Sequence, residues 1–172
     1  MSLRVIVGDT RPEVLNVWRD ALRTVSGFEF RSLDTERFCA LPDLDALLIL
    51  SAAAHHHDGA PFEPGTSQVL SAPPELPHVK RVVTTPPMPA QLRVNQWGHM
   101  DAVPSKHRSP AEGAYLEFRE IFRAVRTFNA EGANRGIGTL GVHLELINAP
   151  LGDARTEAEA VKRAYLEEIG KA

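Results

Sequence analysis

The sequence is poor in cysteine and has no long hydrophobic run. A single cysteine, Cys39, cannot form an intramolecular disulfide, and it cannot supply the paired thiols of a zinc or redox motif. No apolar stretch is long enough to cross a bilayer, and the chain enters an apolar segment at Leu3 without the pattern of a signal peptide. We therefore expect a soluble, cytoplasmic protein with no membrane partner.

Basic residues are not in excess, since 19 Lys and Arg stand against 22 Asp and Glu and give a formal charge of -3. The only tight basic cluster is Lys106-His107-Arg108. Without a dense basic stripe the chain cannot neutralise a row of phosphates, so we expect no nucleic-acid partner. Its 172 residues, of which 43% are hydrophobic, suit a single domain with one packed core, and we predict one domain over residues 1–172.

Apolar and amphipathic stretches alternate along the chain. Their composition predicts strands over residues 3–7, 28–33, 45–50, 67–72, 79–85 and 140–147. Apolar residues at every third or fourth position predict helices over residues 10–25, 110–128 and 156–169. We expect little regular structure in the long polar connection 90–108. The alternation predicts an α/β fold with three layers, in which helices flank a mixed sheet.

Polar residues that suit helix starts precede each predicted helix. Asp9 or Thr10 is expected to cap the first helix, and Ser109 with Glu112 forms a capping box for the second. The last helix is expected to begin at Thr156, which forms a capping box with Glu159. His143 lies inside the final apolar strand, where we expect a core histidine with its hydrogen bonds satisfied.

The stretch SAAAHHHDGA, residues 51–60, follows the most apolar predicted strand. We expect an extended loop here, in which His55 and His57 share one side and His56 points to the other. Two convergent imidazoles fall short of the three protein ligands of a catalytic zinc, and no His-Glu-x-x-His spacing adds a third. We therefore predict no metal and no cofactor. Histidines at a strand end could instead face a phosphate or a sugar.

Four motifs follow one another along the chain: LDTERF, LDALLIL, SAAAHHH and then DG. In this order they resemble the aspartate turn, the central strand and the Ala-Ala-Asn loop with following glycines of the macro domain, the fold that binds ADP-ribose and related nucleotides. VVTTPPM resembles the next strand and turn of that family, and AYLEFREIFRAV resembles a helix of some bacterial members. The resemblance spans most of the chain and implies a macro-domain-like mixed sheet with a ligand pocket at the ends of its central strands.

The resemblance implies that Asp34 accepts a hydrogen bond from the adenine amino group, which would otherwise be buried without a partner. Asp34 is equally suited to a turn between strands. The implied second phosphate loop is NAPLGDART, residues 148–156, which contains the single glycine Gly152. GIGTLG, residues 136–141, is richer in glycine, but the polar segment before it cannot be a buried strand. A strand over residues 132–135 would reverse this assignment.

Three features depart from the family pattern. Its asparagine is replaced near Ala54 and His55, and the second loop has lost most of the glycines that let backbone approach phosphate. The helix expected after the first loop has no room between Gly59 and Gly65. We therefore predict binding of ADP-ribose, or of a related nucleotide-derived or phosphorylated small molecule, with no catalytic residue set. The predicted site residues are Asp34, Ser51, Ala54, His55, His56, His57, Gly59, Asn148, Gly152 and Asp153. The alternatives are an ADP-ribosyl hydrolase, a metal-dependent hydrolase that uses His55–His57, and a structural module that binds a protein partner.

Overall fold

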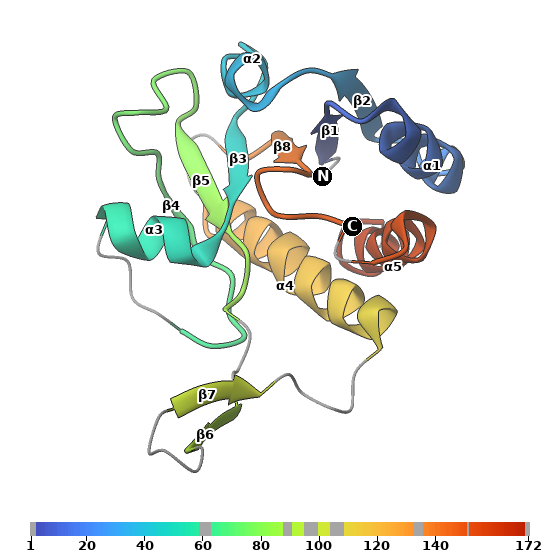
Figure 1. The fold of residues 1–172 in the computed structure, drawn as a ribbon. Helices are drawn as coiled ribbons and strands as arrows, with labels where there is room; N and C mark the ends of the chain where they lie inside the picture. The colour runs from blue at the N-terminus through green and yellow to red at the C-terminus, as the bar shows by residue number, and fades with distance from the viewer. Residues whose placement is uncertain are drawn as a thin grey trace.

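A computed structural model describes residues 3–58, 63–87, 91–94, 100–103, 109–132, 136–150 and 152–170. Within these ranges a six-stranded mixed sheet lies between helices (Figure 1). The predicted α/β class with a mixed, helix-flanked sheet is thereby confirmed. None of the helices in the described ranges combines the length and the apolar character needed to cross a membrane.

The strands of the main sheet have the order β2-β1-β8-β3-β5-β4. In chain order they are β1 (Arg4–Asp9), β2 (Phe28–Ser32), β3 (Ala46–Ile49), β4 (Val69–Ser71), β5 (Arg81–Thr84) and β8 (Thr139–His143). Adjacent strands are parallel except for β4, which pairs antiparallel with β5. The strand closest to the C-terminus, β8, therefore lies in the middle of the sheet, between β1 and β3 (Figure 1).

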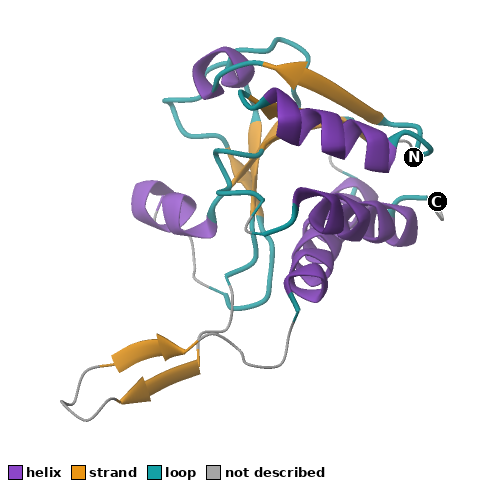
Figure 2. Ribbon diagram, turned by 45° about the vertical axis from the view of Figure 1, so that its right-hand side comes forward, coloured by secondary structure: helices purple, strands orange, loops and turns teal. Residues whose placement is uncertain are grey.

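Three long helices pack on one face of the sheet: α1 (Pro12–Leu22), α4 (Pro110–Ala130) and α5 (Ala154–Glu168) (Figure 2). Their apolar stripes share one hydrophobic cluster with Val5 and Val7 of β1. The short helices α2 (Thr35–Cys39) and α3 (Ser51–Asp58) contribute Phe38 and Ala54 to a second cluster with Ile6 of β1. Because neighbouring residues of β1 belong to different clusters, the sheet separates two apolar layers.

Local signals in the sequence predicted most of these elements. All four residues of β3 are buried, as expected for a central strand covered on both faces. The Ser109 hydroxyl accepts a hydrogen bond from the Glu112 amide at 3.2 Å, so the predicted cap of α4 is confirmed. The predicted apolar stripe of α4 is buried as well, through Tyr115, Phe118, Ile121, Phe122 and Val125.

Two predicted irregular segments contain regular structure. The stretch expected to be an extended loop after β3 is the helix α3, because its run of alanines has high helix propensity and Ala54 buries its methyl group. The polar connection 90–108 contains a separate antiparallel pair, β6 (Gln91–Val94) and β7 (Met100–Val103). Apart from these two strands, the connection lies outside the described residues.

Three predicted boundaries are wrong. Strand β8 ends at His143, and turns replace the expected strand from residue 144 onward. Helix α5 is capped by Asp153, whose Oδ2 accepts from the amide and the hydroxyl of Thr156, so Thr156 is not the cap. In helix α1 the cap position is occupied by Arg11, whose side chain makes no cap hydrogen bond. The expected cap, Asp9, accepts from the Arg11 amide, which lies before the helix.

Charged groups line the seam between α4 and α5. Glu168 of α5 is only 4% exposed, and its carboxylate oxygens lie 3.2 Å from Arg123 and 3.0 Å from Arg126. Glu117 of α4 has a different environment, because burial together with the negative charge of Glu157 raises its pKa to about 7. The carboxyl group of Glu117 therefore ionises near neutral pH.

Replacing Glu117 by Gln is expected to stabilise the protein only where the wild-type carboxyl is ionised. The pKa is raised from 4.5 to about 7 on folding, so the wild type loses stability as the pH rises through this interval. At 1.36 kcal/mol per pKa unit the variant gains up to roughly 3 kcal/mol at about pH 8 and almost nothing at about pH 4. Urea unfolding at the two pH values measures the difference.

The matched control is Glu75→Gln, since Glu75 is exposed in the loop before β5. This control is expected to leave the free energy of unfolding unchanged at both pH values. A gain in Glu117→Gln that is the same at both pH values would contradict the assigned pKa.

Candidate functional site

Five parallel strands, β2, β1, β8, β3 and β5, end at the same side of the sheet, the carboxyl edge. The chain that leaves β8 continues to α5 on one face, whereas the chain that leaves β3 continues directly into α3 on the other. The two connections thus diverge between the ends of β3 and β8. In open α/β sheets ligands bind at such a divergence point, outside the carboxyl ends of the strands.

Three predicted site residues from distant parts of the chain lie at the carboxyl edge. Ser51 is the first residue of α3, and its amide donates to the Thr85 hydroxyl at 3.2 Å, just beyond β5. Asn148 belongs to the turn after β8. Asp34 follows β2, and the carbonyl of its neighbour Leu33 lies 2.9 Å from Nε2 of the histidine that ends β8. Ser51, Asn148 and Asp34 therefore share one edge of the sheet.

The histidine stretch does not form the predicted extended loop. In the helix, successive side chains point in directions about 100° apart, so the expected alternation of His55 and His57 against His56 is wrong. His55 and His56 are exposed, with ring centroids 6.0 Å apart, whereas Ala54 is buried. The side chain of His57 and all of Gly59 lie outside the described residues. No cluster of His, Cys, Asp and Glu able to hold a metal occurs among the residues that are described.

Asp34 has a structural task in this arrangement. Its Oδ1 accepts a hydrogen bond from the Arg37 amide at 2.8 Å and thereby caps α2. Its Oδ2 lies 3.6 Å from the Arg37 guanidinium, and half of the side chain is exposed (51%). The carboxylate is thus available at the surface of the carboxyl edge, although one of its oxygens is already used.

The segment after β8 contains the other three predicted site residues. Asn148 has a left-handed backbone (φ 56°), a conformation that asparagine adopts more readily than most residues, and it is exposed. The Ala149-Pro150 peptide that follows is cis. Gly152 is exposed, and Asp153 caps α5, so its carboxylate is engaged by Thr156. These bonds from Thr156 lower the pKa of Asp153.

The sequence reading assigned Asp9 to helix capping and missed its role at this edge. Asp9 ends β1 and is completely buried (0% exposed). Its Oδ1 accepts from the amide and Nε of Arg11 at 2.7 and 2.8 Å, and its Oδ2 accepts from Nη2 at 2.6 Å. Burial by itself would raise the pKa of Asp9, but the hydrogen bonds and charge of Arg11 outweigh it and lower the pKa. Asp9 is therefore a buried carboxylate.

Arg11 connects this carboxylate to the other end of the chain. Its Nη2 donates to the carbonyl of Ala149 at 2.8 Å, although the two residues are 138 positions apart. Beside this contact the Thr10 hydroxyl donates to Oε1 of Glu145 at 2.7 Å. The connection after β1 is thus tied to the segment after β8. An aspartate at the end of an apolar strand with an arginine two positions later is the only trace of this contact in the sequence.

His143 ends β8 and is fully buried. Its Nε2 contacts the Leu33 carbonyl at 2.9 Å, so this nitrogen carries the proton and donates. Nδ1 is buried without a hydrogen-bond partner among the described residues, so the expectation of a satisfied core histidine holds for one nitrogen only. The ring packs edge-on against Phe38, at 5.1 Å between centroids. A Cβ at Gly8 would meet both rings, at 2.4 Å from Phe38 and 2.8 Å from His143, so this position requires glycine.

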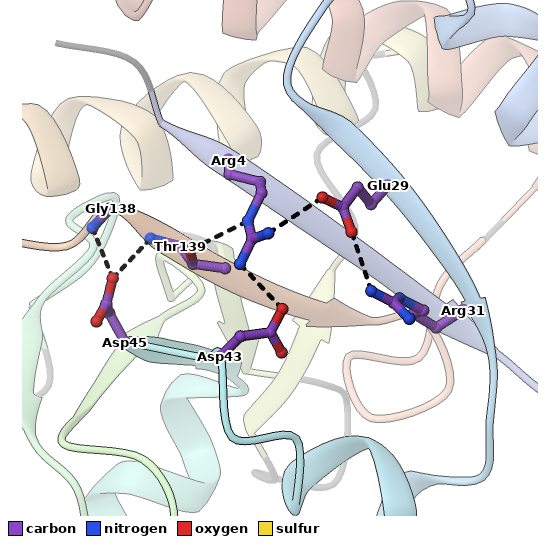
Figure 3. Close-up of polar contacts among 7 residues, drawn as sticks. All are labelled: Arg4, Glu29, Arg31, Asp43, Asp45, Gly138 and Thr139. Carbon is purple, nitrogen blue, oxygen red and sulfur yellow. Dashed lines mark hydrogen bonds and ion pairs between the residues drawn. The ribbon is translucent and has the colours of Figure 1, made fainter.

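The glycine-rich segment 136–141 begins at the opposite side of the sheet, the amino edge, and runs into β8. Asn129 binds both the amide and the carbonyl of Ile137. Oδ2 of Asp45 accepts from the amides of Gly138 and Thr139, each at 2.9 Å (Figure 3). These amides are already used within the protein and cannot cradle a phosphate. The position of this segment agrees with its assignment to the last strand and not to a phosphate loop. Residues 133–135, which precede it, lie outside the described residues.

A polar cavity of about 720 Å³ lies beside the segment after β8, between the first turns of α4 and α5. Its charged and polar lining includes Ser109, Glu112, Tyr115, Arg155, Thr156 and Arg163. Arg163 lies over the Tyr115 ring at 4.1 Å, and the Tyr115 hydroxyl donates to Glu167 at 2.5 Å. None of the predicted site residues lines this cavity. Because it has arginine side chains and lies near the carboxyl edge, it serves as a control location for ligand binding.

Comparison of the chain with protein-family models and with curated proteins found no significant match. The macro-domain resemblance therefore remains a hypothesis that depends on the motifs and their order. The candidate site depends on the geometry of the carboxyl edge alone.

Removing the Arg11 side chain is expected to destabilise the protein because Asp9 would remain buried without a cation. Breaking a buried pair in this way costs about 3 kcal/mol near neutral pH. Folding lowers the pKa of Asp9 in the wild type, whereas without Arg11 burial alone raises it, so the deficit of Arg11→Ala is full near neutral pH and shrinks as the pH falls and the variant's Asp9 takes up a proton. Urea unfolding at about pH 7 and about pH 3 measures both effects.

Arg155→Ala serves as the matched control, because Arg155 pairs with Asp20 at the surface, where the two side chains are 61% and 48% exposed. An exposed pair contributes at most about 1 kcal/mol. Equal losses of unfolding free energy in Arg11→Ala and Arg155→Ala would show that the Asp9–Arg11 pair stabilises the fold no more than an exposed pair does.

Proposed function

We propose that the protein binds a nucleotide-derived phosphorylated small molecule of the ADP-ribose class at the carboxyl edge, between the ends of β3 and β8. The observation that carries this proposal is that Asp34, the start of α3 and Asn148 all follow strands that end at the carboxyl edge, where the chain diverges between β3 and β8. These segments are the ones that the macro-domain resemblance assigns to adenine and phosphate. The proposed location is the cytoplasm, in keeping with the single cysteine.

The start of α3 has features that suit a phosphate. Its first residues, Ser51 to Ala54, are small, so a ligand can approach the backbone closely. The amides of Ala53 and Ala54 both donate to the Leu50 carbonyl, whereas the Ala52 amide has no acceptor among the described residues. Ala52 is exposed, and the positive end of the helix dipole lies there. A phosphate oxygen at this amide would complete the first turn.

The proposal includes no catalytic step. Hydrolysis of an ADP-ribose conjugate would need an asparagine or an acid poised beside the ligand, and the buried acid of this edge, Asp9, is held by three hydrogen bonds from Arg11. The exposed histidines of α3 lack a described third ligand for a metal. If the protein bound none of these ligands, the remaining alternative would be a structural module that binds a protein partner.

Isothermal titration calorimetry with ADP-ribose, AMP and inorganic phosphate tests the proposal at the start of α3. Ala52→Glu places a negative charge at the exposed amide and is expected to weaken ADP-ribose binding at least about tenfold. Ala52→Gln has a similar size without the charge and is the matched control, with an affinity within about threefold of wild type. Equal affinities of Ala52→Glu and wild type would place the ligand elsewhere.

A second pair of variants tests the adenine contact of Asp34. Asp34→Ser keeps a good cap for α2 but removes the carboxylate, so it is expected to weaken ADP-ribose binding without lowering stability. Arg163→Ala, in the cavity between α4 and α5, is expected to leave binding unchanged. If Arg163→Ala alone lost binding, the ligand would be assigned to that cavity. If titration with zinc gave a heat of binding and titration with ADP-ribose gave none, the metal-dependent alternative would be favoured.

A further inference from the structure

The two edges of the main sheet differ in how they are protected. Strand β4 has three residues, and prolines at 73 and 74 follow it closely. Strand β2 has five residues and contains no proline, and no strand of the described chain pairs with its outer edge (Figure 1). An open, regular edge strand exposes unpaired backbone groups that another strand can join.

The register with β1 determines which backbone groups of β2 point outward. The Val5 amide donates to the Gly27 carbonyl at 2.7 Å, and Val5 is aligned with Phe28. In a parallel pair successive residues face opposite sides, so Gly27, Glu29 and Arg31 bond to β1. The amides and carbonyls of the intervening residues therefore point away from the sheet. These outward residues are Phe28, Phe30 and Ser32.

We propose that the outer edge of β2 pairs with β2 of a second copy of this chain, antiparallel and around a two-fold axis at Phe30. In this register Phe30 lies opposite Phe30 of the second copy, and Phe28 lies opposite Ser32. Each of these pairs consists of outward-facing residues, so every free amide and carbonyl of the edge finds a partner. The two sheets then form one continuous sheet across the dimer.

The side chains of β2 are complementary to themselves in this register. Glu29 lies opposite Arg31 of the second copy, and Arg31 lies opposite Glu29, so two cross-strand ion pairs form. In the single chain these two side chains are 38% and 46% exposed and already lie on the same face of β2, with their charged atoms 3.1 Å apart (Figure 3). Shifting the register by two residues would place Glu29 opposite Glu29 or Arg31 opposite Arg31, which charge repulsion disfavours.

The opposite face of β2 supplies an apolar contact. Phe28 and Phe30 pack toward α1 and flank a cavity of about 410 Å³ that Leu22 and Val25 also line. Opposite residues of an antiparallel pair lie about 5.5 Å apart, so the Phe30 rings of the two copies come into contact at the axis. Arg19 lies 5.6 Å from the Phe30 ring, where it can stack on both rings.

A second copy fits this edge better than an acidic peptide. Arginines 19, 23 and 31 line the cavity, which by itself would favour an acidic partner. However, Arg23 lies 3.7 Å from Asp20, and Arg31 is paired with Glu29. The match of outward residues and of charges in one register is specific to β2 itself.

Two single charge reversals, measured alone and together, test the proposed register. Arg31→Glu gives Glu opposite Glu in its own dimer, and Glu29→Arg gives Arg opposite Arg. Mixed in equal amounts, the two variants restore opposite charges at both positions. In sedimentation equilibrium from about 1 μM to about 1 mM, the wild type and the mixture are expected to approach twice the monomer mass, and each variant alone is expected to remain monomeric.

A backbone variant separates strand pairing from other contacts. Ser32→Pro removes an outward amide for which no backbone acceptor is found in the described part of the chain, whereas Ser32→Ala keeps it. Ser32→Pro is expected to be monomeric and Ser32→Ala to dimerise like the wild type, with circular dichroism to verify folding. A wild type that stays monomeric at every concentration, a mixture of reversals that does not dimerise, or a folded Ser32→Pro that dimerises as tightly as Ser32→Ala would overturn the proposal.

Discussion

The pairing of β8 with both β1 and β3 is the constraint on which the rest of the structure depends. All five residues of β8 are buried, and this strand alone joins the β2-β1 side of the sheet to the β3-β5-β4 side. Its partners lie near the start and in the first third of the chain. The sheet therefore cannot close until nearly the whole chain is present, and the entropy of closing that long loop opposes the pairing until the core forms.

The polar contacts at the two edges of the sheet hold β8 in this position. At the amino edge Arg4 contacts Thr139 and Asp43, and Asp45 accepts from two amides at the start of β8 (Figure 3). At the carboxyl edge the buried Asp9 carboxylate orients Arg11 toward the Ala149 carbonyl. The first edge fixes the register of β8, and the second fixes the segment that borders the proposed ligand site.

Local physical signals were enough to predict the elements that depend on local energetics. The Ser109 cap, the apolar stripe of α4 and the fully apolar β3 were all readable, because each follows from a few neighbouring residues. The helix α3 was missed because the motif order favoured a loop over the helix propensity of its alanines. The cap of α5 was placed three residues late because Asp153 and Thr156 are both suitable caps, and only the backbone geometry distinguishes them.

The sequence by itself determined the alternation of strands and helices, the α/β class and the clustering of polar residues after the apolar strands, because periodicity and propensity act over a few residues. Only the tertiary structure decided that β8 lies at the centre, that Asp9 is a buried ion rather than a helix cap, and that Asp34, Ser51 and Asn148 share one edge. These features depend on contacts between residues that are far apart in the sequence. Arg11 and Ala149, for example, are 138 positions apart. No local pattern encodes which strands become neighbours.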